Sequence, residues 1–267
     1  MRLQRTYTLR SGLAEGLKKR SAIDFRKTLG GGLRKTLGGG LRKTLGVDRS
    51  PLAEEEEFLR DLDFSGRTIF DVGAFVGIHT LFFAHRAGST GHVVAFEPDP
   101  ENYHRTLTNV RINGFENVAV LNVGLGRHSE ALLFAYPDDR GQGSAEPAIR
   151  EKLLHRGDAR TVTVPVRPLD EEIAERELPD PDFVKIDVEG LELAVLEGMA
   201  QTVARCRPTL FIEIHGADEA EKERNVGRVA RWLSERGYAM THVESNRPVT
   251  PSSSQLAREG HLYCTSR

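Results

Sequence analysis

The sequence predicts a doubly wound α/β domain with a mainly parallel sheet that begins near Arg67. Short apolar runs rich in β-branched residues alternate with helical patterns of about ten or more residues, as repeated β–α–β units require. The 267 residues are 39% hydrophobic, which is enough for one medium-sized core. Acidic residues and glycines directly follow several apolar runs, at the strand ends where ligands bind in such sheets.

The expected strands are short and apolar, and polar or glycine-containing segments flank them. They cover residues 68–72, 92–96, 117–122, 131–136, 161–166, 182–187, 209–214, 238–243 and 261–265. The expected helices cover residues 78–86, 99–113, 191–200 and 219–236. Ser50 and Pro51, which precede an acidic run, predict one further helix with Ser50 as its N-cap.

Residues 1–49 differ from the rest of the chain in charge and in texture. They carry 13 Lys and Arg against three acidic residues, whereas acidic residues outnumber basic ones in 50–267. The octapeptide FRKTLGGG recurs as LRKTLGGG across 25–40, and a third copy begins at Leu41. Glycine triplets interrupt helices and two apolar residues per repeat cannot build a core, so we expect the basic arm before the folded domain to be largely disordered or to form short helical fragments.

Cysteine content and hydropathy exclude several classes of protein. The two cysteines supply neither a disulfide framework nor a metal cluster, which fits a cytoplasmic location. No apolar run is long enough for a membrane span, and no apolar segment after the basic start indicates a secretory signal. The acidic domain makes nucleic acid an unexpected partner, while the basic arm suits contact with an anionic surface.

A glycine-containing turn follows the first expected strand. It runs from Asp71 through Gly73, Ala74 and Phe75 to Gly77, where the next helix begins. Gly73 permits a sharp turn close to a ligand, and the helix N-terminus offers unpaired N–H groups to a carboxylate or a phosphate. The spacing is not G-x-G-x-x-G, which weakens the case for a nicotinamide dinucleotide.

An acidic residue follows the second strand. Glu97, followed by Pro98, stands about twenty-five residues after the glycine turn. A carboxylate at this place can accept hydrogen bonds from both ribose hydroxyls of an adenosine ligand. The pair of motifs therefore predicts an adenosine-binding site.

Further ionisable residues follow the later strands. Asp187 lies at the end of a buried strand, Glu189 comes two residues later, and Lys185 shares one face of the sheet with Asp187. Glu213 and His215 end the next strand in the same way. A structural ion pair between Lys185 and Asp187, and a surface role for His215, are the alternatives to catalytic roles.

Four segments together resemble the FkbM family of S-adenosylmethionine-dependent methyltransferases. They are DVGAFVGIHT at 71–80, VVAFEPDP at 93–100, FVKIDVEGLELAVLEGM at 183–199 and RPTLFIEIHG at 207–216. The most specific parts are the K-x-D-x-E-G element and the following E-x-H element. The resemblance implies a Rossmann-like fold, S-adenosylmethionine as cofactor, and a hydroxylated small molecule, such as a sugar or a natural product, as methyl acceptor.

The resemblance also implies roles for individual residues. Asp71, Gly73 and Gly77 would shape the methionine-binding turn, and Glu97 would bind the ribose. Asn122 and Val123, with the glycine after them, lie where methyltransferases of this fold usually contact adenine. Phe75 is a departure, because the family commonly has Asn at that position.

Methyl transfer to an alcohol requires alignment of donor and acceptor and removal of a proton. Our hypothesis is that Asp187 or His215 accepts that proton, while Glu189 and Glu213 orient the substrate or the base. A divalent metal held by Asp187, Glu189 and Glu213 is possible but not favoured, because metal-free sites also carry carboxylates after adjacent strands.

Two other functions are compatible with the same fold. A nicotinamide-dependent oxidoreductase would need the G-x-G-x-x-G spacing that the chain lacks. A non-catalytic scaffold that binds S-adenosylmethionine would not need the acidic residues after three strands. The acceptor itself leaves no motif in 138–160 or 244–260, the segments expected to line its pocket.

Overall fold

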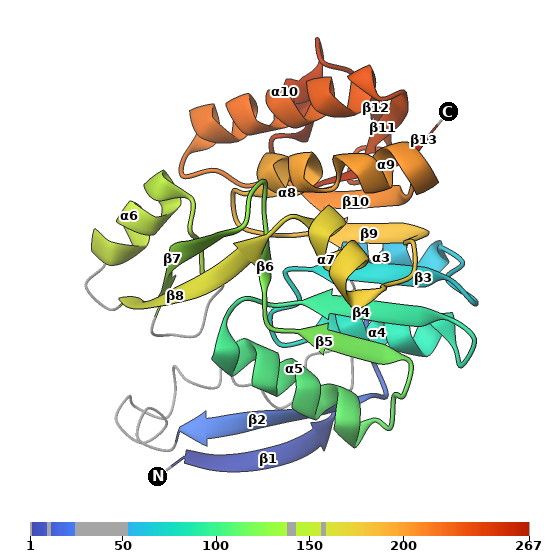
Figure 1. Ribbon diagram of the computed structural model, residues 1–267, viewed down its shortest axis with the longest axis vertical. Coiled ribbons are helices and arrows are strands. Elements are labelled where there is room, and N and C mark those ends of the chain that lie inside the picture. The colour runs from blue at the N-terminus through green and yellow to red at the C-terminus, as the bar shows by residue number, and fades with distance from the viewer. Residues whose placement is uncertain (1, 10–11, 25–52, 138–142, 156–158, 267) are drawn as a thin grey trace.

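A computed structural model of the chain describes residues 2–9, 12–24, 53–137, 143–155 and 159–266. Its main sheet has eight strands in the order β12-β11-β13-β10-β9-β3-β4-β5 (Figure 1). The five strands that run parallel are β3 (Thr68–Val72), β4 (His92–Phe96), β5 (Val118–Leu121), β9 (Phe183–Ile186) and β10 (Thr209–Glu213). Three further strands join the sheet through antiparallel pairs, and they are β11 (Tyr238–His242), β12 (Arg247–Val249) and β13 (His261–Ser266).

The doubly wound α/β fold is confirmed. From β3 the chain moves outward to β4 and β5, then returns to place β9 on the other side of β3. The boundary between β3 and β9 is therefore the topological switch point, where the loops after the two strands diverge and leave room for a ligand.

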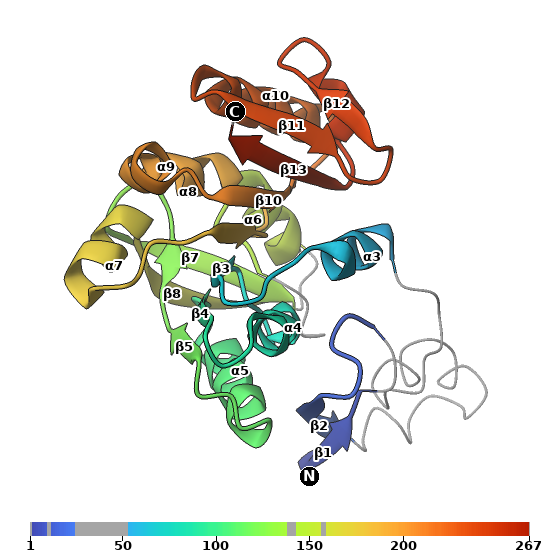
Figure 2. The ribbon, with the colours of Figure 1, turned by 90° about the vertical axis from the view of Figure 1, so that its right-hand side faces the viewer.

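Helices cover both faces of this sheet (Figure 2). The helices of one face are α3 (Glu54–Asp61), α4 (Ile78–Ala87) and α5 (Pro100–Ile112). Those of the other face are α7 (Leu169–Arg176), α8 (Glu192–Gly198), α9 (Ala200–Cys206) and α10 (Glu219–Glu235), with the short helix η1 (Ser254–Ala257) beside α10.

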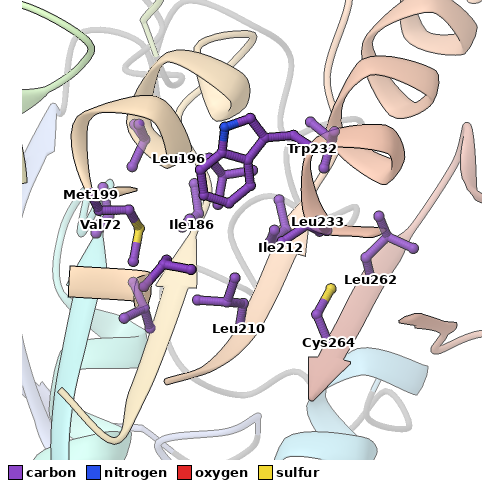
Figure 3. Close-up of a cluster of buried hydrophobic side chains, with 14 of the residues drawn as sticks. Val72, Ile186, Leu196, Met199, Leu210, Ile212, Trp232, Leu233, Leu262 and Cys264 are labelled. Carbon is purple, nitrogen blue, oxygen red and sulfur yellow. The ribbon is translucent and has the colours of Figure 1, made fainter. Parts of the chain in front are cut away.

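Each central strand supplies side chains to the cores on both faces. In β10, Leu210 and Ile212 enter the core under α8 and α10 (Figure 3). Phe211 packs on the opposite face with Phe183. This alternation follows from the two-residue period of a strand. It also directs Lys185 and Asp71 toward the α4 face, where Thr80 of α4 donates a hydrogen bond to Asp71.

A second, three-stranded sheet lies beside the carboxyl ends of the main strands. It consists of β6 (Gly124–Leu125), β8 (Ala159–Arg167) and β7 (Glu130–Pro137), in that order. Strands at 131–136 and 161–166 were expected, but the sequence pattern did not show that they leave the main sheet. The segment expected to be irregular contains helix α6 (Pro147–His155).

The N-terminal arm contains a feature that the sequence analysis did not predict. Strands β1 (Arg2–Thr8) and β2 (Lys18–Asp24) pair as an antiparallel hairpin next to α5 (Figure 1). Asn113 exchanges hydrogen bonds with the backbone of Lys18, and Asn109 accepts one from the N–H of Arg20. This part of the arm is therefore ordered by backbone pairing and by its contacts with α5, which the sequence analysis did not expect. The repeats of residues 25–46 lie outside the described residues.

The start of α3 also differs from the prediction. Ser50 and Pro51 lie outside the described residues, and the helix begins at Glu54 with Ala53 as N-cap. The side chain of Glu56 accepts a hydrogen bond from the N–H of Ala53, so the acidic first turn caps the helix. In the part of the chain that the structure describes, no helix combines the length and apolar character needed to cross a membrane.

Candidate active site

The turn after β3 approaches β9 closely at the switch point. Gly73 has φ +83°, and a Cβ atom there would lie 1.8 Å from the carbonyl oxygen of Asp187. Phe75 also has a positive φ, of 52°, a conformation that costs about 1–2 kcal/mol for a residue other than glycine. Gly77 starts α4 with φ +82°, and a Cβ there would press on Thr106 of α5. The turn therefore has a fixed shape that only glycine permits at two of its positions.

Glu97 fixes the same turn from the second strand. Its carboxylate accepts hydrogen bonds from the N–H of Phe75 at 2.7 Å and the N–H of Asp99 at 2.9 Å. Burial raises the pKa of Glu97 to about 8, although these two hydrogen bonds favour the charged form. In the ionised form of Glu97, each carboxylate oxygen keeps capacity for another hydrogen bond, so a pair of hydroxyls can bind here.

A cavity of about 530 Å³, measured out to its open mouth, lies between these two loops and the turn after β9. Its walls are mainly apolar and aromatic, with a few polar groups, as in small-molecule sites generally. The lining residues are Val72, Gly73, Phe75, Phe96, Glu97, Pro98, Asn102, Gly124, Leu125, Phe134, Tyr136, Gly143, Asp187, Val188, Glu189 and Leu191.

Some residues expected at the cofactor site do not line this cavity. The exposed Asn122 donates hydrogen bonds to the carbonyls of Glu97 and Pro98, which holds that loop in place. Val123 is 3% exposed and packs in the main core. Ala74 is buried and its N–H donates to the carbonyl of Phe96. These three residues therefore support the loops and the core around the cavity and do not line it.

A buried charged cluster joins the ends of β3 and β9. The Nζ atom of Lys185 lies 3.1 Å from Asp187 and 3.7 Å from Asp71. All three side chains are less than 9% exposed. Burial opposes the charge of Lys185, but the two carboxylates outweigh it and raise its pKa. The ion pair considered in the sequence analysis is thus present, and Asp187 also lines the cavity.

His215 stands among four carboxylates. Its Nδ1 atom lies 2.9 Å from Glu192, which is 1% exposed. Its Nε2 atom lies 3.5 Å from Glu213, 3.8 Å from Glu189 and 3.9 Å from Asp187. Glu213, Glu189 and Asp187 thus all lie near His215, and Lys185 joins the group through its ion pair with Asp187. The structure therefore brings together all five residues for which a catalytic role was expected.

The charge of His215 opposes one of the expected roles. Burial lowers its pKa, but hydrogen bonds to Glu192 and Glu213 and the surrounding negative charges outweigh that effect and raise the pKa to about 11. A group that is protonated at neutral pH cannot accept a proton from an acceptor hydroxyl. The raised pKa therefore argues against His215 as the base.

Glu189 and Glu213 have opposite environments. Burial raises the pKa of Glu189 to about 7, although His215 favours its charged form. Burial also opposes ionisation of Glu213, but hydrogen bonds from His215 and His261 outweigh it and lower that pKa. The surroundings therefore favour the ionised form of Glu213, while the charge of Glu189 changes near neutral pH.

Two sets of side chains in the described part of the chain could each share a cation. One comprises Asp187, Glu213 and His215, whose nearest ligand atoms lie within 4.8 Å of one another, and the other comprises Glu55, Glu244 and His261. The sequence analysis considered Asp187, Glu189 and Glu213 as metal ligands, whereas the first set contains His215 in place of Glu189. The raised pKa of His215 favours its protonated form, which already places a positive charge near these carboxylates.

Sequence reasoning missed the wall that the second sheet contributes. Phe134 and Tyr136 reach the cavity from β7, where only the alternation of apolar residues marked them as one face. Ser144 donates a hydrogen bond of 2.6 Å to the carbonyl of Glu189. Glu189 itself has φ 53°, so the second sheet supports a strained turn of the site.

Comparison with protein families decides between the alternatives. The family model described as methyltransferase FkbM domain matches residues 71–240. The chain belongs to the FkbM methyltransferase family. The matched region contains both loops of the cavity and the whole cluster around His215, and membership excludes the nicotinamide-dependent oxidoreductase.

Curated relatives of this FkbM-family chain are methyltransferases. The hexuronic acid methyltransferase AglP of Haloferax volcanii is 30% identical over 181 residues, which cover 67% of this chain and 66% of that protein. Methyltransferase 1 of Beauveria bassiana is 28% identical over 146 residues, which cover 49% of this chain and 57% of that protein. The chain thus spans less than two thirds of the length of these relatives.

Two solved methyltransferase structures match the chain with low sequence identity. A methyltransferase FkbM from Methylobacillus flagellatus has a TM-score of 0.49 and 21% identity, with 77% of this chain and 45% of that chain covered. An O-methyltransferase from Bacillus cereus has a TM-score of 0.49 and 17% identity, with 82% and 83% covered.

The close approach of Gly73 to Asp187 generates a first prediction. Gly73→Ala should abolish binding of S-adenosylhomocysteine, measured by titration calorimetry, because the new methyl group collides with the backbone carbonyl of Asp187, directly after β9. Gly114→Ala is the matched control, because it has a similar φ of +71° and open space around it. It should lose only about 1–2 kcal/mol of stability from backbone strain. Equal binding by both variants would contradict the proposed shape of the site.

Proposed function

We propose that the chain transfers a methyl group from S-adenosylmethionine to a hydroxyl of a small molecule. The observation that carries the proposal is the convergence of the Gly73 turn, the Glu97 carboxylate and Asp187 on one cavity. Such a site can hold an adenosine-containing donor and place an acceptor next to a carboxylate. Membership of the FkbM methyltransferase family supports the same reaction.

The residues of the cavity fit the donor. Glu97 presents acceptors for the ribose hydroxyls, and apolar walls at Phe96, Pro98 and Leu125 suit a flat base. The N-terminus of α4 begins at Gly77 and offers N–H groups to a carboxylate. S-adenosylmethionine supplies the electrophilic methyl group when it is bound.

The protein's own contribution is binding, orientation and removal of a proton. We assign the role of base to Asp187, which lines the cavity and is held by Lys185 at 3.1 Å. Protonated His215 anchors Glu189 and Glu213 in place, and in its ionised form Glu189 orients the acceptor from the cavity wall. Fixed alignment of the two reactants supplies much of the catalysis that such a displacement needs.

A sugar or a similar hydroxylated metabolite is the proposed acceptor class. The relative from Haloferax volcanii is named a hexuronic acid methyltransferase, and its similarity covers 67% of this chain. The polar groups Asp187, Glu189 and Asn102 at the cavity surface suit a ligand with several hydroxyls. A panel of sugars, uronic acids and polyketide alcohols with labelled S-adenosylmethionine would identify the acceptor.

Replacing the proposed base tests the mechanism. Asp187→Asn should lower kcat about 100-fold or more, because proton removal is lost, while the affinity for S-adenosylhomocysteine stays the same. Asp180→Asn is the control, since Asp180 forms an exposed ion pair with Arg205 away from the site. Full turnover by Asp187→Asn would remove the residue from this role, and absence of turnover by the wild type with every acceptor would support a scaffold.

The raised pKa of Glu189 predicts a pH dependence. Below about pH 7 Glu189 is neutral and cannot orient the acceptor as an anion, so kcat should rise with pH through this range. Glu189→Gln should lower kcat and remove this rise, as measured by initial rates from pH 5.5 to 9. Glu235→Gln, on an exposed residue at the end of α10, should keep the wild-type profile. A profile unchanged in Glu189→Gln would assign the titration to another group.

We further propose that the transfer needs no divalent metal. Lys185 and protonated His215 already place positive charge among the carboxylates of the site. Dialysis against EDTA should therefore leave the rate of methyl transfer unchanged. A loss of activity that Mg²⁺ or Mn²⁺ restores would instead identify Asp187, Glu213 and His215 as metal ligands.

A further inference from the structure

Tyr136 carries a hydroxyl that the fold does not satisfy. The side chain lines the cavity from β7 and is 3% exposed. Its hydroxyl oxygen is buried and has no hydrogen-bond partner among the described residues. A buried hydroxyl without a partner costs about 1–3 kcal/mol, so its presence in a ligand cavity calls for an explanation.

The position of this ring is fixed from several sides. The ring of Phe134 stacks against it at a centroid distance of 5.9 Å and an interplanar angle of 19°. The guanidinium of Arg160 lies 4.6 Å from the ring centroid and also pairs with the buried Asp99. A Cβ atom on Gly143 would lie 2.1 Å from the ring, so only glycine fits there. The hydroxyl is therefore held in one place before any ligand binds.

The electrostatic surroundings keep this hydroxyl a donor. Burial raises the pKa of Tyr136, and the negative charges of Glu97 and Asp99 raise it further. The phenol thus stays protonated on the side of the cavity where Glu97 lies. Glu97 accepts hydrogen bonds and Tyr136 can donate one, so the two groups are complementary in chemistry.

A vicinal diol matches this pair of groups. When the two hydroxyls of a ribose donate to the ionised carboxylate of Glu97, the lone pairs of their oxygens can still accept a hydrogen bond from a further donor. We propose that the hydroxyl of Tyr136 donates a hydrogen bond to a ribose hydroxyl of the bound methyl donor, beside Glu97. This assignment rests on the proposed function and adds a specificity-determining residue from the second sheet.

Tyr238 provides a contrast within the same chain. Its ring is also buried, at 4% exposed, but its hydroxyl donates to the carbonyl of Pro208 at 2.9 Å. The hydroxyl of Tyr238 thus stabilises the fold away from the cavity, whereas that of Tyr136 has no such partner among the described residues. The two tyrosines allow a matched comparison of removing one hydroxyl.

The test compares Tyr136→Phe with Tyr238→Phe by calorimetric titration with S-adenosylhomocysteine. Tyr136→Phe should weaken binding about five- to tenfold, because one hydrogen bond is lost, and its melting temperature without ligand should not fall. Tyr238→Phe should bind as the wild type does and melt about 2–4 °C lower.

Ligands that lack one ribose hydroxyl locate the contact. The 2′-deoxy or the 3′-deoxy form of S-adenosylhomocysteine should lose affinity for the wild type, and for one of the two the loss should be smaller with Tyr136→Phe. Wild-type affinity in Tyr136→Phe, or equal losses for both proteins with both analogues, would overturn the ribose contact and leave the proposed function standing. No binding of S-adenosylhomocysteine by the wild type would instead overturn the proposed function, and this inference with it.

Discussion

The site depends on the buried lysine that joins the carboxyl ends of β3 and β9. Lys185 lies between Asp71 and Asp187, and all three groups are shielded from water. Removing the cation would leave two uncompensated carboxylates inside the protein, which costs about 3–5 kcal/mol in comparable cases. A backbone hydrogen bond from the N–H of Asp187 to the carbonyl of Val72 joins the same two strand ends, where the carbonyl of Asp187 lies close to Gly73. The ion pairs of Lys185 therefore both join the ends of β3 and β9 and hold Asp187, the proposed base, in place.

The second sheet converts an open strand end into an enclosed cavity. Phe134 and Tyr136 supply an aromatic wall, and Ser144 holds the carbonyl of Glu189. Arg160 ties this sheet to Asp99 in the loop after β4. Because these contacts come from residues inserted between β5 and β9, the main sheet keeps its doubly wound form while the inserted segment forms part of the cavity wall.

Charge distribution in the site separates residues of similar type into different roles. Four carboxylates surround His215, so the imidazole is held as a cation. Glu213 is kept ionised by His215 and His261, whereas Glu189 titrates near neutral pH because burial dominates. A histidine after a strand indicates a base when it is considered alone. Its neighbours, which come from α8 and the ends of β9 and β10, change that interpretation.

The sequence by itself determined the parallel core, the glycine turn, the acid after β4 and the residues around Asp187, because strand periodicity and local motifs encode them. Its expected strands and major helices agree with the structure to within a few residues. Only the tertiary structure decided the separate sheet of β6, β7 and β8, the docked hairpin of the arm, the wall at Tyr136 and the charge of His215. These features depend on contacts between residues far apart in the chain, and burial and electrostatics act through such contacts rather than through sequence spacing.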